Sequence, residues 1–194
     1  ATSAGTTSLL VSNPNGAGGA SAALKLGVSP EDNSVAKFAV IHERFNSYGR
    51  GDTYFCSNFA ADTTEVTDAD AVVTIKGSTG NVGIGVTPSY KLHVSGDIYA
   101  TGNVTAYSSA VAKDNISTID NALDIVERLR GVTFDWKETG KKAVGLIYEE
   151  VKEVIPELTS EKEGHVGVAY QNTVAVLIEA VKTLSAKVKE LEEK

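Results

Sequence analysis

Two side chains near the middle of the chain have the types and the spacing for nucleophilic chemistry. Ser108 is followed, five residues later, by Lys113. A serine hydroxyl is a poor nucleophile at neutral pH and needs a base, and a lysine beyond a turn can reach back to take its proton. Ser109 is the alternative nucleophile if the spacing is shifted by one residue. The same spacing is common in ordinary polar turns, so on its own it gives catalysis weak support.

The chain before this pair is predicted to consist of short β-strands. Gly, Thr, Ser and Val are abundant there, and glycine stands at nearly every corner, which suits tight turns of the backbone. We expect strands at 8–12, 22–28, 35–44, 52–59, 72–76, 82–86, 91–94, 98–100 and 104–106. Strands this short cannot cover their apolar faces and edges within one chain. The pattern therefore predicts a trimeric neck, either a β-prism or an interwoven triple β-helix.

The chain after the pair has a mostly helical pattern. We expect a helix from about 119 to 131 capped by Ser117, a strand over 132–137, a hairpin loop at 137–142 and a short helix over 148–154. The short helix must end before Pro156, because the residue preceding a proline is disfavoured in the helical conformation. The predicted fold class is α+β, with a β-rich neck followed by a mixed α/β domain.

The last segment, 174–194, has the periodicity of a coiled coil. Its apolar residues alternate spacings of four and three and are Leu177, Val181, Leu184, Val188 and Leu191. Valine at a positions with leucine at d positions favours two strands, whereas the β-rich neck favours threefold closure. We predict a homotrimer held by this stripe.

From Tyr107 to the C-terminus the chain carries an ordered set of motifs. The set comprises Ser108, Lys113 and Asn115-Ile116, then Ala122-Leu123 through Phe134 and Trp136, then Gly145–Leu158, and finally Gly167–Leu184. In this order they resemble the intramolecular chaperone auto-processing domain at the C-terminal end of phage endosialidase tailspikes and long tail fibres. The neck sequence between 80 and 108 is similar to tail-fibre necks that precede this domain.

The resemblance implies a function for each part of the chain. Residues 1–107 would be a tail-fibre tip or neck, and residues 108–194 a chaperone domain that trimerises and directs folding of the neck. The chaperone would then be released by a single self-cleavage, with Ser108 as nucleophile and Lys113, neutral through desolvation, as general base. The first choice of bond is Tyr107–Ser108, and the alternative is Ser108–Ser109. Such a protein is made in the host cytoplasm and resides in the virion tail fibre.

This chain departs from the family pattern around the nucleophile. The usual pattern has an aspartate directly after the serine and a basic residue and a leucine before the lysine, where this chain has Ser109, Val111 and Ala112. A non-cleaving trimerisation tip is therefore one alternative. The other is a receptor-binding tip that contacts a host cell surface through loops between 35 and 59.

Composition and motifs argue against several other classes. A net charge of −7 gives no basic footprint for nucleic acid, and no run of about 18 apolar residues predicts membrane insertion. We expect no cofactor and no metal site, because no ligand spacing for a metal is present around His165, which is predicted to be a loop residue. Cys56 is predicted to be a core residue, Arg50-Gly51-Asp52 a polar turn, and Glu149 and Glu150 part of a solvated helix face.

Overall fold

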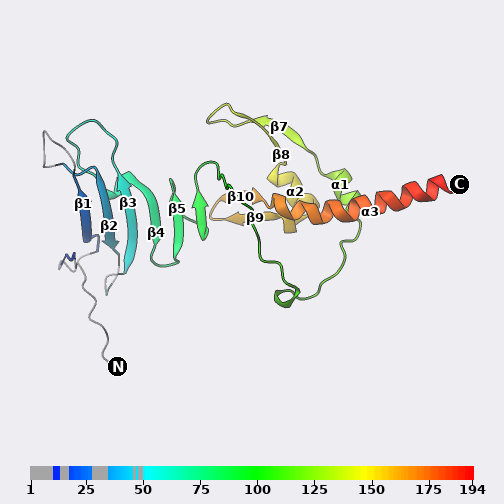
Figure 1. Cartoon of the computed structure of the whole chain (residues 1–194), viewed down its shortest axis with the longest axis horizontal. Helices are drawn as coiled ribbons and strands as arrows, with labels where there is room; N and C mark the ends of the chain where they lie inside the picture. Colours follow the sequence, from blue (N-terminus) through cyan, green and yellow to red (C-terminus); the bar gives the residue numbers. More distant parts are fainter. Residues whose placement is uncertain (1–10, 14–17, 28–34, 46, 48–49) are drawn as a thin grey trace, which may run out of the picture. The chain divides into compact units, whose positions relative to one another are not determined.

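The computed structural model describes residues 11–13, 18–27, 35–45, 47 and 50–194. The chain forms two compact units, Ala1–Val104 and Thr105–Lys194, called here the N-terminal and C-terminal units (Figure 1). Strands dominate the first, and the second mixes helices with two hairpins, so the α+β class predicted from the sequence is confirmed. The predicted strand at 8–12 lies outside the described residues except for its last two, which are not in a strand.

A six-stranded sheet forms the N-terminal unit, with its strands hydrogen-bonded in sequence order. The strands are β1 (Ser21–Leu26), β2 (Phe38–Arg44), β3 (Gly51–Ser57), β4 (Ala71–Lys76), β5 (Asn81–Ile84) and β6 (Leu92–Val94). Neighbours are antiparallel except for β5 and β6, which are parallel. Six of the predicted strands are thus present, because each apolar run ends at a glycine, proline or polar turn where the chain can reverse.

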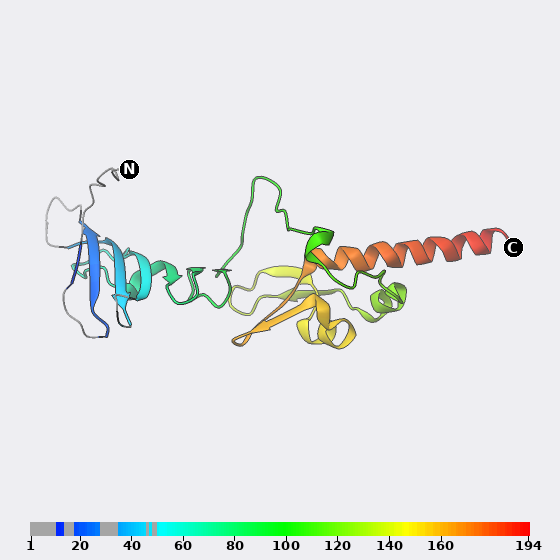
Figure 2. The same cartoon turned by 90° about the horizontal axis from the view of Figure 1, so that it is seen from below.

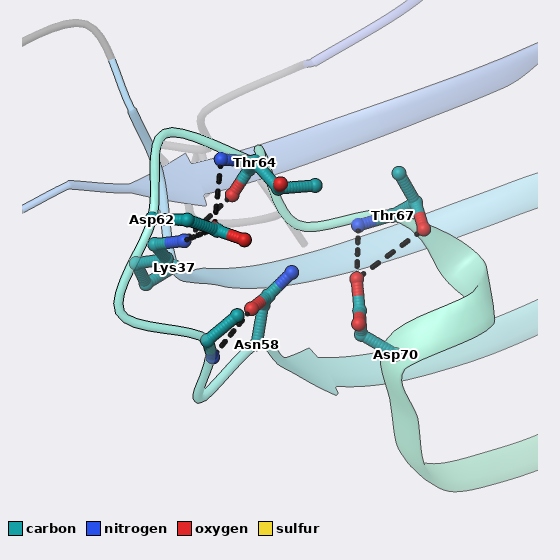
Figure 3. A network of polar contacts seen from close by, with 7 residues as sticks. Lys37, Asn58, Asp62, Thr64, Thr67 and Asp70 are labelled. Atoms are coloured by element: carbon teal, nitrogen blue, oxygen red, sulfur yellow. Dashed lines mark hydrogen bonds and ion pairs between the residues drawn. The ribbon is translucent and has the colours of Figure 1, made fainter.

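One face of this sheet is covered by the chain itself. Its core consists of Ala36, Ala39, Ile41, Cys56 and Val66. Val66 comes from the loop between β3 and the short 3-10 helix η2 (Asp68–Asp70), and its backbone N–H donates to the Ala36 carbonyl. The loop is fastened by Lys37, whose Nζ lies 3.0 Å from Asp62 Oδ1 and 2.7 Å from the Thr64 carbonyl oxygen (Figure 3). These bonds hold the loop over the sheet without a regular element.

The strands predicted at 98–100 and 104–106 are wrong for a single chain. Residues 97–109 have no regular structure, and Ile98, Tyr99 and Val104 are exposed. A strand needs a neighbour to accept its backbone hydrogen bonds, and within the described residues this segment pairs with none. The trimeric neck, as β-prism or triple β-helix, stays a prediction.

The C-terminal unit has three α-helices, three short 3-10 helices and two hairpins. They are η3 (Ala110–Ala112), α1 (Ala122–Arg128), β7 (Val132–Asp135), β8 (Lys142–Gly145), α2 (Tyr148–Val154), η4 (Pro156–Leu158), β9 (Thr159–Lys162), β10 (His165–Val168), η5 (Tyr170–Asn172) and α3 (Thr173–Glu192), where η marks a 3-10 helix. β7 pairs with β8 and β9 with β10, both antiparallel. The expected strand over 132–137, the loop after it and the helix over 148–154 are confirmed.

The core of this unit lies between α1, α2, η4 and the first half of α3. Its buried residues are Ala122, Val151, Leu158, Val176 and Ala180. Partly buried aliphatic residues of α1, among them Leu123, Ile125 and Val126, pack around them. The spacing of these residues along α1 and α3 places them on one face of each helix, so the two helices bury their facing stripes.

Two sequence expectations for this unit are wrong. The helix predicted from 119 with Ser117 as cap begins at Ala122, and its N-cap is Asn121 in the left-handed conformation (φ 53°), which small polar residues tolerate. His165 was expected in a loop but opens β10, in a hairpin that the sequence reading missed. The turn residues Glu163 and Gly164 both have positive φ, 52° and 80°, as a two-residue type I′ hairpin requires.

Candidate functional site

The segment between the sheet and α1 brings the predicted nucleophile and base together. Lys113 Nζ lies 2.6 Å from Ser108 Oγ. The single turn of η3 separates them, closed by bonds from the Ala112 N–H to the Ser109 carbonyl and from the Lys113 N–H to the Ala110 carbonyl. This turn reverses the chain over five residues, which lets the long lysine side chain fold back onto the serine. The contact is the one that a serine–lysine proton transfer needs.

Ser109, the alternative nucleophile, is engaged in a different contact. It is the N-cap of η3, and its hydroxyl oxygen accepts a hydrogen bond of 3.3 Å from the Val111 N–H. A serine at this position commonly satisfies an otherwise free N–H of the first helical turn. The two serines therefore differ: Ser108 contacts the lysine, and Ser109 stabilises the turn that places the lysine.

The surroundings of Ser108 and Lys113 are open to solvent. Both residues are exposed, as are Tyr107, Val111 and all the residues from Ala110 to Thr118. Within the described part of the chain, no carboxylate forms an ion pair with Lys113, consistent with Ser109 standing where the family pattern has aspartate. A lysine acts as a base only when neutral, and desolvation is what favours the neutral amine. One copy of the chain has the reacting atoms in contact but not the water-poor environment.

The second candidate site is the stripe predicted on the last helix. Leu177, Val181, Leu184, Val188 and Leu191 lie on α3 and are 45% to 70% exposed. Val174 is also exposed and extends the same alternation by one step, because it lies three positions before Leu177. This residue was not predicted from the sequence. Inward-facing Val176 and Ala180 are buried, so the stripe is a second apolar face of the same helix.

The second half of α3 lacks neighbours within its own unit. Every residue from Val181 to Lys194 is exposed, and Figures 1 and 2 both show this part of α3 running beyond the other elements of the C-terminal unit. Its ion pairs, Lys182 with Glu179 and Lys194 with Glu190, are within the helix. An isolated helix of this length is marginal in water, so packing against other helices is the usual source of its stability.

Other residues singled out in the sequence have structural roles. The polar turn predicted at Arg50-Gly51-Asp52 is wrong, because Gly51 and Asp52 open β3. Asp52 is 5% exposed and accepts a hydrogen bond from the Gly77 N–H, so its carboxylate is not presented as an adhesion ligand would be. Glu150 binds Arg130, whose guanidinium lowers the pKa of that carboxyl. Burial raises the pKa of the Cys56 thiol, which disfavours a reactive thiolate.

Over the described ranges, no group of three or more His, Cys, Asp and Glu side chains is placed to hold a metal ion. In the same residues no helix has the length and the apolar character needed to cross a bilayer.

Part of the C-terminal unit is similar to a known protein family. Residues 108–160 match the family model described as chaperone of endosialidase, which confirms the resemblance predicted from the sequence. The long tail fiber proteins Gp37 of Enterobacteria phages K3 and T2 are each 40% identical over 115 residues, which covers 52% of this chain. The chain spans 9% of the length of these relatives. They are virion components, in agreement with the predicted location in a tail fibre.

Proposed function

We propose that the C-terminal unit gathers three copies of the chain, directs folding of the β-rich segment before it, and is then released by one self-cleavage at Ser108. The observation that carries this proposal is the exposed apolar stripe of α3, which the described part of the chain leaves uncovered. Burying a leucine or valine side chain contributes about 1.5–3 kcal/mol. Six such residues per helix, in three helices, provide a driving force for assembly.

Early trimerisation solves a kinetic problem of the N-terminal segment. Residues 97–109 carry apolar side chains but pair with no strand among the described residues, so their pairing would come from other copies. Pairings between chains form slowly, because the entropy of association is lost before the contacts are gained. Helices that assemble first would hold the three segments at high effective concentration. This is the chaperone step.

Cleavage would follow from the Ser108–Lys113 contact. Neutral Lys113 takes the proton from Ser108 Oγ, and the oxygen attacks the Tyr107 carbonyl carbon. The C–N bond between Tyr107 and Ser108 breaks, the amine of Ser108 takes the proton back from Lys113, and an ester joins the two residues. Water then hydrolyses the ester, leaving a carboxylate on Tyr107 and a free amine on Ser108. The Ser108–Ser109 bond is the alternative point of cleavage.

Assembly is the event that would supply the missing environment. Ser108 and Lys113 are solvent-exposed in one chain, whereas a neighbouring copy packed against residues 105–118 would exclude water from them. Desolvation favours the neutral lysine. In this scheme the cut waits until the neck has folded, and loss of the chaperone removes the easy route back to the unfolded state.

Mass spectrometry of the expressed chain tests the proposal. We expect fragments divided at Tyr107–Ser108 from the unaltered protein and an intact chain from Ser108→Ala and Lys113→Ala. Ser109→Ala distinguishes the two serines: because Ser109 caps the turn and does not contact the lysine, this variant should still be cut, although more slowly than the unaltered chain. An intact unaltered chain that sediments as a trimer would replace self-cleavage by the non-cleaving trimerisation tip, and a folded monomer would refute the chaperone role.

A second function, contact with a host receptor through the N-terminal unit, is favoured by Phe59. This side chain is 90% exposed, directly after Asn58, whose Oδ1 accepts a hydrogen bond from the Ala60 N–H (Figure 3). The bonds between Lys37 and Asp62 fasten the other end of the loop. An exposed aromatic on a fastened loop loses little conformational entropy on binding, which suits a contact residue.

Binding of the full chain to enterobacterial envelope fragments tests this second function. The relatives come from phages of enterobacteria, which sets the choice of envelope. We expect Phe59→Ala to weaken binding at least tenfold and Phe45→Ala, another exposed phenylalanine of the same unit, to leave it unchanged. Absence of binding by the unaltered chain at micromolar concentration would refute the receptor role.

A further inference from the structure

The six-stranded sheet has a second face that the described chain does not cover. The strand register places one apolar side chain from every strand side by side across this face. This apolar row consists of Leu24, Val40, Phe55, Val73, Ile84 and Val94. Leu26 and Phe38 lie beside it on the same face, and Leu92 lies at its β6 end. The larger of these side chains are 36% to 58% exposed.

Most charged residues of the sheet lie on its covered face, whereas a sheet with one face in water normally carries them on the solvated face. Alternation along the strands puts Lys25, Glu43, Asp52 and Lys76 on the face that the loop of Val66 covers. The uncovered face carries Arg44 at its margin and otherwise only apolar residues, Thr53, Ser57 and His42. Depletion of charge is the compositional mark of an interface core.

The uncovered face is also large for a surface exposed to water. The six large side chains Leu24, Leu26, Phe38, Phe55, Ile84 and Leu92 together expose on the order of 500 Å² at the fractions above, near the top of the roughly 300–600 Å² patch found on monomers. The valines of the apolar row add to it. A stable interface buries about 800 Å² per partner. The large apolar side chains of one such face thus supply more than half of that area.

We propose that the uncovered face is where copies of this chain meet in the N-terminal unit, with the apolar rows of three sheets facing one another about the threefold axis. A row without charges complements itself, so identical faces can pack without leaving an unpaired charge. Consecutive strands of one chain pair with each other from β1 to β6 (Figure 1). This favours a β-prism, built of one sheet per chain, over an interwoven helix. The inference rests on the proposed homotrimer.

Cysteine cross-linking of the full chain tests the face. In a Cys56→Ser, Ser108→Ala background, which removes the native thiol and the proposed cut, single cysteines replace Leu24, Phe55 or Ile84 on the face. Phe45→Cys is the matched control, because Phe45 is an exposed aromatic of the same unit outside the sheet. Leu184→Cys on α3 reports assembly of the helices independently. Each variant is treated with a short bis-maleimide and run on a denaturing gel.

We expect dimer bands from one or more of the three face positions and from Leu184→Cys, and none from Phe45→Cys. Cross-links at Leu184 without any at the face would overturn this inference while leaving the proposed trimer intact. Face cysteines that react readily with a monofunctional maleimide but form no cross-link would also overturn it, because the face would then be open to solvent and not packed against a copy. Cross-links at the face without any at Leu184 would support the face and count against assembly through α3.

Discussion

Lys113 Nζ and Ser108 Oγ lie 2.6 Å apart across one 3-10 turn, and both side chains are open to solvent. The contact needs no other copy, because the turn and its Ser109 cap are local. What one copy cannot provide is the removal of water that a lysine base requires. The two conditions for the proposed cleavage are thus separated: the local turn provides the geometry, and assembly would provide the environment.

Replacing Lys113 by arginine tests whether Lys113 acts as a general base or only as a positively charged hydrogen-bond donor. Arginine keeps the charge and can still donate a hydrogen bond to Ser108, but it is not deprotonated in proteins. We expect Lys113→Arg to slow cleavage at least a hundredfold. The thermal unfolding midpoint of the C-terminal unit should stay unchanged. Intact-mass measurement over time gives the rate. Cleavage at the normal rate in this variant would exclude Lys113 as the base.

Breaking the α3 stripe should prevent both assembly and cleavage. Leu184→Asp puts a charge into the apolar stripe, and the cost of burying it in three copies exceeds the gain from the neighbouring contacts. We expect monomers in sedimentation and no cut at Ser108. Ala186→Asp, on the same exposed half of the helix but outside the stripe, should remain trimeric and be cut. A cleaved monomer would show that assembly does not control the reaction.

The sequence predicted best those features whose cause is local. The Ser108–Lys113 contact was expected because five residues span one turn, and the helix at 148–154 because Pro156 sets its end. The six strands of the sheet were found because glycine and polar turns interrupt each apolar run. The hairpin at 159–168 was missed, since Glu163 adopts a positive φ that its residue type does not signal.

Features that depend on contacts far along the sequence could not be predicted from local patterns. Ile98 and Val104 have the residue types of strands, yet no strand in the described part of the chain pairs with them. The fastened loop after β3 depends on Lys37 reaching Asp62, 25 residues away, and no periodicity reports such a contact. The sequence also did not predict which face of the sheet is apolar and uncovered, because only the strand register shows the face on which Phe55 lies.

Shortening a core side chain should destabilise the C-terminal unit. Val151 is 1% exposed between α1, α2 and α3, so Val151→Ala removes two buried methyl groups and leaves a cavity, at a cost of about 2 kcal/mol. Val144→Ala, on an exposed strand position, makes the same chemical change and should cost less than about 0.5 kcal/mol. Urea unfolding followed by circular dichroism measures both. Equal losses would show that the packing around Val151 does not stabilise the fold.

Acidification should weaken the contact between α2 and β9. Glu161 accepts hydrogen bonds from Lys152 Nζ at 2.7 Å and from the Tyr148 hydroxyl at 2.8 Å, and these bonds lower the pKa of the Glu161 carboxyl. A lowered pKa in the folded state means that the stabilisation is present above the ordinary value of 4.5 and is lost as the pH falls through the folded value. When the free energy of urea unfolding is measured at several pH values, Glu161→Gln should reduce its decrease at acid pH. Glu157→Gln is the control. An unchanged decrease in Glu161→Gln would contradict it.

Alkaline titration should identify a tyrosine of the N-terminal unit that loses its proton at an unusually high pH. Burial, followed by the nearby carboxylates of Glu43 and Asp52, raises the pKa of Tyr54 to about 12 from 10.0. The neutral phenol is therefore favoured by folding, and the stability that it contributes is complete below pH 10 and lost as the pH rises towards 12. In a spectrophotometric titration of the phenolate, Tyr54→Phe should lack the step near pH 12, whereas Tyr99→Phe, a change at a 90% exposed ring, should retain it. A step near pH 12 that persists in Tyr54→Phe would place the perturbed tyrosine elsewhere and would argue against the register that sets Tyr54 beside Ile41 on the covered face.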